Sequence, residues 1–451
     1  MTKRFFGTDG VRGVANKEPI TAETVLKLGK ALAKIVNKNH SSNRKRILIG
    51  KDTRISGNML EMALAAGICS MGMDVILAGE IPTPAIAFLT TDMMCDAGAV
   101  ISASHNPFED NGIKFFNGKG LKFDDTQELA IEELLGSETF IEVNDDPGRL
   151  GQVLKLEDAL GRYLVFLKNS LGRGANLKGL KIVVDCANGA GFEAAPKVFQ
   201  ELGAEVICLS NCPDGRNINF ECGSLHPERM TEELLRNDAH LGVALDGDGD
   251  RAIFADEKGK VVDGDQIMGM VAADLYERGS LKKNTLVATV MSNVGLEISM
   301  KERGIDMVRT PVGDRNVVEK MLSGGYNFGG EQSGHLVFFD HSTTGDGILS
   351  ALQVCSIMKR RSAALSELTG WIKKFPQVLN NLPINCRINF EEIPEVRKVI
   401  SDCQKRLGQS GRILVRYSGT QSLCRVMVEG EDQGLVQKIV AEVSNAIVRN
   451  M

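Results

Sequence analysis

One pattern occurs three times along this chain and limits its possible folds more than any other feature. Each copy begins with a short run rich in β-branched residues, typical of a buried strand, at 46–50, 181–185 and 285–290. A polar turn, a helix-like stretch, a glycine and a second short strand follow in every copy. Because a strand, a helix and a strand in succession form a parallel, right-handed unit, we predict three related α/β domains built on mixed sheets.

The last part of the chain departs from this pattern. Its predicted elements are strands at 384–388, 412–416 and 424–428 and helices at 395–407 and 433–448. Two of these strands follow each other across a loop instead of a helix, which is typical of an α+β domain. The prediction is therefore four domains, at 1–152, 153–254, 255–368 and 369–451.

The charge and hydropathy of the chain exclude several classes of protein. Lys and Arg number 53 and Asp and Glu number 58, so the net charge of −5 gives no positive field for nucleic acid or an anionic membrane surface. No stretch reaches the roughly 20 apolar residues of a membrane-spanning helix, and the first residues lack the apolar segment and cleavage site of a signal peptide. We expect a cytoplasmic monomer or homodimer that binds neither nucleic acid nor a membrane.

Four potential zinc ligands lie close together in the sequence, Cys208, Cys212, Cys222 and His226. The first two are farther apart than in Cys-x-x-Cys, and the residues between the pairs are typical of turns. Ten cysteines spread over a chain without an export signal are better explained as buried apolar residues than as disulfides or zinc ligands.

A third strand in each copy ends in a distinctive polar loop. These loops are 99–107, 242–251 and 327–335. Ligands of open α/β sheets collect at the carboxyl ends of the strands, so we expect the chemistry of the protein in these loops.

The second loop alternates aspartate with glycine. Asp246, Asp248 and Asp250 face the same way in an extended segment, so three carboxylates converge. A hard divalent cation such as Mg²⁺ would offset their repulsion. An EF-hand would need glycine at its sixth position, where this chain has Arg251, and helices at its flanks, which look like strands. We therefore favour a Mg²⁺ site with open positions over an EF-hand or a solvated acidic turn.

The first loop places Ser104 at the end of a strand, followed by His105. A hydroxyl here could be a hydrolase nucleophile, a phosphate carrier or a turn residue that caps the next helix. The G-x-S-x-G pattern of a hydrolase elbow is missing around Ser104, which argues against acyl transfer.

Two further loops offer groups for a sugar and a phosphate. Glu331 and Ser333 stand among glycines, where their oxygens suit sugar hydroxyls, although a plain glycine-rich turn is the commoner explanation. The other loop offers a guanidinium, two hydroxyls and an accessible backbone N–H to a phosphate, or else is a hairpin with solvated arginines. Its residues are Arg416, Ser418, Gly419 and Thr420, with Arg425 nearby. All four loops together indicate phosphoryl transfer on a phosphorylated polyol.

At these residues the chain resembles the α-D-phosphohexomutase superfamily. Members of that superfamily carry a serine loop, an Asp-Gly-Asp-Gly-Asp-Arg loop, a Gly-Glu-x-Ser-Gly-His loop and an Arg-x-Ser-Gly-Thr loop in this order, and all four are present here. The similarity extends from Phe6 to Glu429. The motifs at 6–13, 101–108 and 312–315, together with Gln332, are most similar to those of members that act on glucosamine phosphates.

The resemblance implies a role for each candidate residue. Ser104 is expected to carry a phosphoryl group and to bind Mg²⁺ together with Asp246, Asp248 and Asp250, and Lys114 is expected to shuttle protons. The other expected catalytic residues are His105 and Arg251, and the expected substrate-binding residues are Arg12, Glu331, Ser333, Arg416, Ser418, Gly419, Thr420 and Arg425. Gln421 stands where the family usually has glutamate, so this chain lacks a carboxylate there.

The activity that the resemblance implies is the interconversion of glucosamine 6-phosphate and glucosamine 1-phosphate, which feeds amino-sugar nucleotide synthesis for cell-wall precursors. A hexose 1,6-bisphosphate would serve as intermediate and activator. A glucose- or mannose-phosphate mutase of the same superfamily is the nearest alternative. A sugar-phosphate phosphatase and a non-catalytic sugar-phosphate-binding protein are more distant ones.

Overall fold

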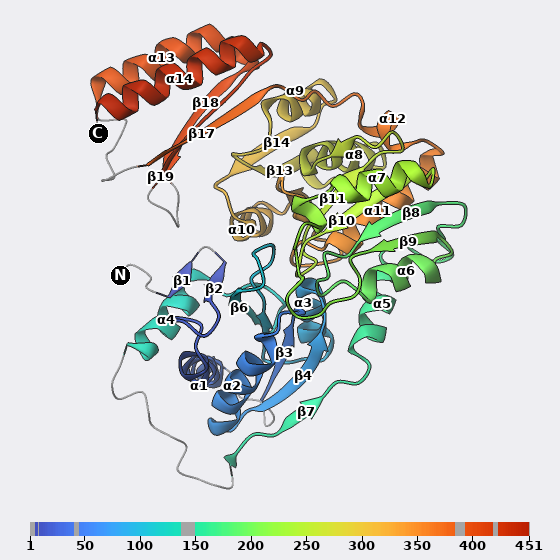
Figure 1. Ribbon diagram of the computed structural model, residues 1–451, viewed down its shortest axis with the longest axis vertical. Coiled ribbons are helices and arrows are strands. Elements are labelled where there is room, and N and C mark those ends of the chain that lie inside the picture. The colour runs from blue at the N-terminus through green and yellow to red at the C-terminus, as the bar shows by residue number, and fades with distance from the viewer. Residues whose placement is uncertain are drawn as a thin grey trace.

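The computed structural model describes residues 5–7, 9–39, 45–136, 149–383, 393–417 and 423–450. These residues form four sheets, of seven, five, four and three strands. Figure 1 shows the first three domains packed together, while the last domain stands at the upper left and adjoins the third. The predicted fold class, three α/β domains followed by an α+β domain, is confirmed.

The first domain is built on a mixed sheet in which β3 pairs in parallel with β4 and β5, while β6 runs antiparallel to β5. The strand order is β1-β2-β6-β5-β3-β4-β7. The strands are β1 (Phe6–Gly7), β2 (Gly10–Val14), β3 (Arg46–Lys51), β4 (Asp74–Glu80), β5 (Ala97–Ile101), β6 (Asp110–Asn117) and β7 (Val153–Lys155). The helices are α1 (Ala22–Asn39), α2 (Gly57–Ser70), α3 (Thr83–Asp92) and α4 (Asp125–Leu135).

Both faces of this sheet are buried, which explains why β3 is apolar without alternation. Ile47 and Ile49 belong to a core formed with α1 and α2, whereas Leu48 belongs to a second core shared with the next two domains. A parallel sheet that is covered on both faces needs such continuous apolar runs. The second core therefore joins the first three domains into one packed body.

The second domain carries a five-stranded sheet in the order β12-β11-β10-β8-β9. Its strands are β8 (Lys181–Asp185), β9 (Glu205–Leu209), β10 (Leu241–Leu245), β11 (Ala252–Ala255) and β12 (Val261–Val262). Its helices are α5 (Ala159–Asn169), α6 (Ala194–Glu201) and α7 (Glu228–Arg236), with a 3₁₀ turn at Gly223–Leu225. Because β8 is parallel to β9 and β10 while β11 is antiparallel to β10, the hairpin between β10 and β11 lies at the carboxyl end of the parallel strands.

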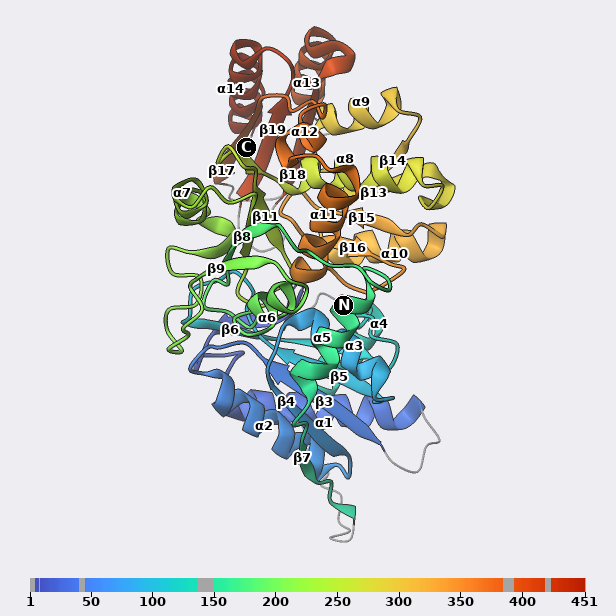
Figure 2. The ribbon, with the colours of Figure 1, turned by 90° about the vertical axis from the view of Figure 1, so that its right-hand side faces the viewer.

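The third domain has a four-stranded sheet in the order β14-β13-β15-β16. Its strands are β13 (Thr285–Thr289), β14 (Asp306–Thr310), β15 (Phe328–Gly330) and β16 (Leu336–Phe338). Its helices are α8 (Gly264–Glu277), α9 (Val294–Glu302), α10 (Asp314–Gly324), α11 (Gly347–Arg361) and α12 (Leu365–Thr369), with a 3₁₀ turn at Lys282–Asn284. Helix α11 also contacts β10, β11 and α5 of the second domain, so it ties the two domains together (Figure 2).

The fourth domain is a three-stranded antiparallel sheet, in the order β17-β19-β18, with two helices packed together beside it (Figure 1). Its elements are β17 (Gln377–Pro383), α13 (Pro394–Leu407), a 3₁₀ turn at Gly408–Ser410, β18 (Arg412–Tyr417), β19 (Leu423–Glu429) and α14 (Gln433–Arg449). The strand predicted at 384–388 lies outside the described residues. No helix among the described ranges is long and apolar enough to cross a membrane.

Candidate active site

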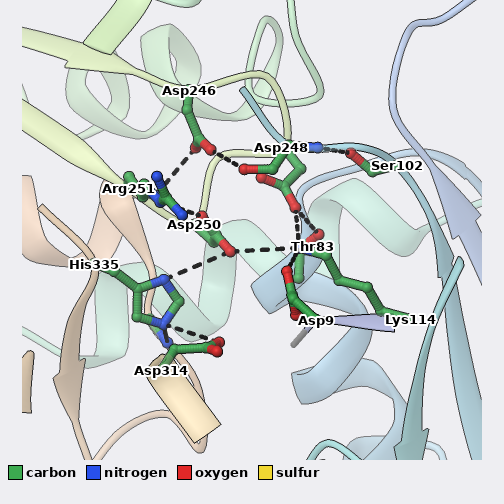
Figure 3. Close-up of polar contacts among 12 residues, drawn as sticks. Asp9, Thr83, Ser102, Lys114, Asp246, Asp248, Asp250, Arg251, Asp314 and His335 are labelled. Carbon is green, nitrogen blue, oxygen red and sulfur yellow. Dashed lines mark hydrogen bonds and ion pairs between the residues drawn. The ribbon is translucent and has the colours of Figure 1, made fainter. Parts of the chain in front are cut away.

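Three buried aspartates form the centre of the candidate site. Asp246, Asp248 and Asp250 lie in the hairpin between β10 and β11, and each offers an oxygen within 4.8 Å of the others (Figure 3). The Oδ1 atoms of Asp248 and Asp250 are buried and have no hydrogen-bond partner. Buried acceptors without donors are costly in a protein, and a hard divalent cation would satisfy them. The donor set therefore fits the predicted Mg²⁺ site.

The geometry fits neither an EF-hand at the aspartates nor a zinc site at 208–226. An EF-hand needs helices on both sides of its loop, and this loop is flanked by β10 and β11. Within the ranges that the structure describes, the aspartates are the only cluster of three or more possible metal ligands, so the four candidate zinc ligands at 208–226 do not converge.

Ser104 lies beside this cluster at the end of β5. Its Oγ atom donates a hydrogen bond of 2.6 Å to Oδ2 of Asp246, and the residue is only 1% exposed. Its backbone adopts the left-handed conformation, with φ of 53°. A non-glycine residue in this conformation is strained and is held by its surroundings.

Two donors from different domains hold the serine loop in place. The guanidinium of Arg54, from the first domain, donates to the backbone carbonyls of Ser104 at 3.1 Å and Asn106 at 2.5 Å. The side-chain amide of Asn219, from the second domain, donates to the same two carbonyls at 2.9 and 3.0 Å. The backbone of Gly247 passes so close that a Cβ there would lie 2.5 Å from the Ser104 carbonyl oxygen. These contacts fix the first and second domains relative to each other at the serine.

Lys114 reaches the aspartates from β6. Its Nζ atom lies 2.9 Å from Oδ2 of Asp248, 3.0 Å from Oδ2 of Asp9 and 3.7 Å from Oδ2 of Asp250. Burial alone would lower the pKa of Lys114, but these carboxylates outweigh it and raise the pKa. Lys114 therefore carries its proton at neutral pH.

The three aspartates are not electrostatically equivalent. Burial and the neighbouring carboxylates raise the pKa of Asp246 well above its usual value. Burial also opposes ionisation of Asp248 and Asp250, but Lys114 lowers the pKa of both, and His335 adds to this effect on Asp250. Ionisation is therefore least favourable at Asp246, next to Ser104, and a divalent cation there would stabilise the ionised carboxylate.

Cationic and neutral groups also lie around the aspartates and Ser104. The Nε atom of Arg251 lies 3.7 Å from Asp250, and Arg12 forms an ion pair of 2.6 Å with Asp9. Nδ1 of His105 is 3.3 Å from the Ser104 Oγ atom. Burial, followed by the charges of Arg251 and Arg12, lowers the pKa of His105 to about 4, so this imidazole is neutral at pH 7. Two arginines close to the serine suit a phosphoryl group there.

The predicted sugar loop connects β15 and β16. Glu331 accepts a hydrogen bond of 3.1 Å from the backbone N–H of Gly313, and Ser333 is exposed and lies 3.4 Å from Glu331. A Cβ on Gly334, whose φ is +89°, would lie 2.2 Å from the carbonyl oxygen of Ala252. Only glycine allows this approach, which brings the sugar loop against the strand that follows the aspartates.

The predicted phosphate loop is described only in part. Arg416 on β18 and Arg425 on β19 are directly opposite each other, whereas Ser418, Gly419, Thr420 and Gln421 lie outside the described residues. Like charges across a strand pair repel. Burial, and then the charge of Arg425, lowers the pKa of Arg416, whose buried Nε atom makes no hydrogen bond. A bound anion would offset the repulsion between these two guanidinium groups.

Several residues of the site were missed by the sequence analysis. Thr83 donates to Asp248 at 2.7 Å, and the His335 imidazole lies 3.5 Å from Asp250 (Figure 3). His335 and Asp9 stand inside motifs that could have suggested them, but nothing near Asn219 in the sequence distinguishes it. Arg315, part of a motif associated with amino-sugar substrates, pairs instead with Asp125 at 2.6 Å and with Glu128 on α4.

Comparison with known families covers nearly the whole chain. Four domain families match, described as phosphoglucomutase/phosphomannomutase alpha/beta/alpha domains I, II and III and C-terminal domain. They match residues 3–142, 162–259, 263–375 and 381–446.

Curated relatives are similar to this chain over its full length. The phosphoglucosamine mutase of Geobacter sp. (strain M21) is 54% identical, over 100% of this chain and 98% of the relative. That of Myxococcus xanthus (strain DK1622) is 52% identical, over 99% of this chain and 97% of the relative.

Solved structures share the fold. A phosphoglucomutase/phosphomannomutase family protein from Burkholderia thailandensis has a TM-score of 0.83 at 23% identity, covering 99% of this chain and 97% of the other. Aspergillus fumigatus N-acetylphosphoglucosamine mutase, in complex with GlcNAc-6P and magnesium, has a TM-score of 0.63 at 20% identity, covering 92% and 85%. The chain therefore belongs to the phosphoglucomutase/phosphomannomutase family, as an isomerase of the mutase class that the phosphoglucosamine mutases represent.

Proposed function

We propose that the protein interconverts glucosamine 6-phosphate and glucosamine 1-phosphate. The observation that carries the proposal is the position of the Ser104 Oγ atom, 2.6 Å from Asp246 at the edge of the aspartate cluster. The full-length similarity to phosphoglucosamine mutases supports the amino sugar as the substrate.

Ser104 carries the phosphoryl group in the proposed cycle. The bond from phosphorus to the Ser104 Oγ atom breaks while a bond to the free hydroxyl of the hexosamine monophosphate forms, and the hydroxyl proton passes to the serine side. The resulting 1,6-bisphosphate turns round and returns its other phosphoryl group to Ser104, and a proton returns to the sugar oxygen. No water is consumed, so the net reaction is isomerisation.

The groups around Ser104 have separate roles. Asp246, Asp248 and Asp250 would hold a Mg²⁺, which when bound would supply charge stabilisation for the transferring phosphoryl group. Lys114, which stays protonated because the carboxylates around it raise its pKa, passes a proton to the leaving oxygen and recovers one from the sugar hydroxyl that is phosphorylated. Arg251, whose pKa Asp250 and Asp246 raise against the effect of burial, stays cationic beside the phosphoryl group.

The remaining candidate residues hold the substrate. Arg416 and Arg425 bind whichever phosphate is distal to Ser104. Glu331 accepts hydrogen bonds from sugar hydroxyls, and Ser333 donates to them. Because the bisphosphate presents either phosphate to the same arginines, one binding site serves both halves of the cycle.

The test compares glucosamine, glucose and mannose phosphates as substrates of the purified protein, followed by ³¹P NMR. We expect kcat/KM for glucosamine 6-phosphate to exceed the other two by at least about 10-fold. Incubation with a hexose 1,6-bisphosphate should add one phosphoryl group to the peptide that contains Ser104, as measured by mass spectrometry. Equal or higher turnover of glucose or mannose phosphates would contradict the substrate, and steady release of inorganic phosphate would indicate a phosphatase.

A further inference from the structure

A buried chain of alternating charges runs beside the aspartate cluster. Oδ2 of Asp9 lies 3.0 Å from Lys114, and Oδ1 of the same carboxylate lies 2.5 Å from Nζ of Lys122. Lys122 also contacts Asp314, whose Oδ2 atom lies 3.6 Å from Nε2 of His335. Lys114 and His335, at the two ends of this chain, both reach Asp250 (Figure 3). With Lys122 between Asp9 and Asp314, the contacts close into a ring.

The ring joins the first three domains. Asp9, Lys114 and Lys122 belong to the first domain, Asp250 to the second, and Asp314 and His335 to the third. The ion pair between Lys122 and Asp314 is the step at which the ring crosses from the first domain to the third. Its side chains are only 11% and 13% exposed, so each charge depends on the other for compensation.

Lys122 and Asp314 contact none of the three aspartates. They act on residues that do contact the aspartates, namely Lys114 and His335. A lysine ammonium on a flexible side chain is placed by its acceptors, and Lys114 has Asp9 and Asp248 as its nearest ones. Asp9 is itself divided between Lys114, Arg12 and Lys122. Loss of the Lys122 charge would let the Asp9 carboxylate move toward Arg12 and carry Lys114 away from Asp248.

We propose that Lys122 and Asp314 are positioning residues for phosphoryl transfer. Their ion pair holds Asp9 on one side and His335 on the other, and through them fixes Lys114 and Asp250 around the transfer site. This inference rests on the proposed mutase reaction and adds two residues to it that contact neither the serine nor the aspartates.

The variants Asp314→Asn and Lys122→Met test the proposal with glucosamine 6-phosphate as substrate. We expect kcat to fall about 10- to 100-fold, the range known for residues that orient catalytic groups, while KM changes less than about threefold. Asp314→Glu and Lys122→Arg keep the charges and should recover part of kcat. The double variant Lys122→Met/Asp314→Asn should be no slower than the slower single variant, because both changes break the same link.

Arg315→Met is the matched control. Arg315 follows Asp314 on α10, and its guanidinium pairs with Asp125 and Glu128 across the same domain interface. Only its backbone N–H contacts the ring, by donating to Oδ1 of Asp314 at 2.8 Å, and Arg315→Met keeps that bond. Its kcat should stay within about threefold of the wild type, because its guanidinium binds no member of the ring, whereas its melting temperature should fall because the buried Glu128 loses its partner. Should Lys122→Met not fold, the nearly isosteric Asp314→Asn carries the test, with its melting temperature as the check on folding.

Three outcomes would overturn the inference. If Arg315→Met lowers kcat as much as Asp314→Asn does, the Lys122–Asp314 ion pair only holds the domains together and has no positioning role. A higher KM with unchanged kcat in Asp314→Asn would make Asp314 a substrate ligand. If the losses of kcat multiply in the double variant, Lys122 and Asp314 act independently and not through their ion pair. If the wild type turns over only another hexose phosphate, the proposed substrate is wrong, and the same series with that substrate still tests the ring.

Discussion

The aspartate cluster and the arginine pair both gather like charges, but the protein treats them differently. Asp246, Asp248 and Asp250 are buried within the packed body of the first three domains, with Lys114 and Arg251 as partial compensation. Arg416 and Arg425 are half-buried on a domain that meets the rest of the molecule through the third domain.

That difference matches two separate functions, phosphoryl transfer at the aspartate cluster and phosphate binding at the arginine pair. The first three domains share one apolar core, so the aspartates, the serine and the lysine have fixed distances to one another. The fourth domain is joined by polar contacts, in which Arg412 donates to the carbonyl of Ser292 at 2.7 Å and Val294 donates to Glu429 at 3.1 Å. Transfer requires precise placement, whereas holding a distal phosphate requires complementary charge.

The largest expected effect is the loss of mutase activity when the serine beside the buried aspartate cluster is removed. Ser104→Ala removes the phosphoryl carrier, and we expect mutase activity to fall by at least roughly 10⁴-fold. Intact-mass spectra should show no phosphoryl group after incubation with the bisphosphate. Ser70→Ala is the control, because the Ser70 hydroxyl donates to the carbonyl of Gly67 in its own helix and, among the described residues, takes no part in the site. Phosphorylation of Ser104→Ala at another residue, with activity retained, would move the reaction elsewhere.

Removal of the cation should have the next largest effect. We expect a chelator to abolish turnover of the wild type and added Mg²⁺ to restore it, because two buried carboxylate oxygens otherwise lack partners. Asp248→Asn should lower kcat by at least about 100-fold and raise the Mg²⁺ concentration needed for half-maximal activity. A Mg²⁺ titration followed by activity and by melting temperature measures both. Full activity in the chelator would exclude the metal from the reaction.

The arginine pair should show the opposite kinetic pattern. Arg416→Ala removes a contact that ground state and transition state share, so we expect KM to rise about 10- to 100-fold while kcat changes less than about threefold. Arg416→Lys keeps the charge without the guanidinium fork and should lie between. Steady-state kinetics with glucosamine 6-phosphate decide this. A large fall in kcat at constant KM would place Arg416 in the transfer step instead.

The clamp on the serine loop should give a smaller effect. Asn219→Ala removes one of two donors to the carbonyls of Ser104 and Asn106, and Arg54 remains. We therefore expect kcat to fall only about 10-fold, with the phosphoryl group still acquired by Ser104. Single-turnover transfer from the phosphorylated protein measures the step directly. Unchanged transfer would show that Arg54 alone holds the loop.

The smallest effect concerns the junction with the fourth domain. Asp265, beside Asn293, has a pKa raised to about 7, first by burial and then by Asp263. A carboxyl whose folded pKa is raised stabilises the fold fully below its unfolded pKa of about 4 and loses that contribution as pH rises toward 7. Between pH 5 and 8 the wild type should therefore lose about 5 °C more in melting temperature than Asp265→Asn. Parallel curves for the two proteins would contradict this.

The sequence was informative where chemistry and local pattern coincide. The repeats predicted the fold class because β-branched runs, turns and glycines are local signals, and the strands at 46–51 and 181–185 follow them closely. The aspartates and Ser104 were predicted because their residue types suit only a few kinds of chemistry. The motif that contains Arg315 gave no sign that this side chain lies against α4.

The sequence by itself determined the list of parts, namely three α/β domains, one α+β domain and a polar loop on each. Only the tertiary structure decided how the parts combine, because packing brings together residues that are far apart in the chain. Asn219 reaches the serine loop from 115 positions away, and Lys122 meets Asp314 across 192. No local pattern encodes such contacts, which depend on the shared core that fixes the three sheets relative to one another.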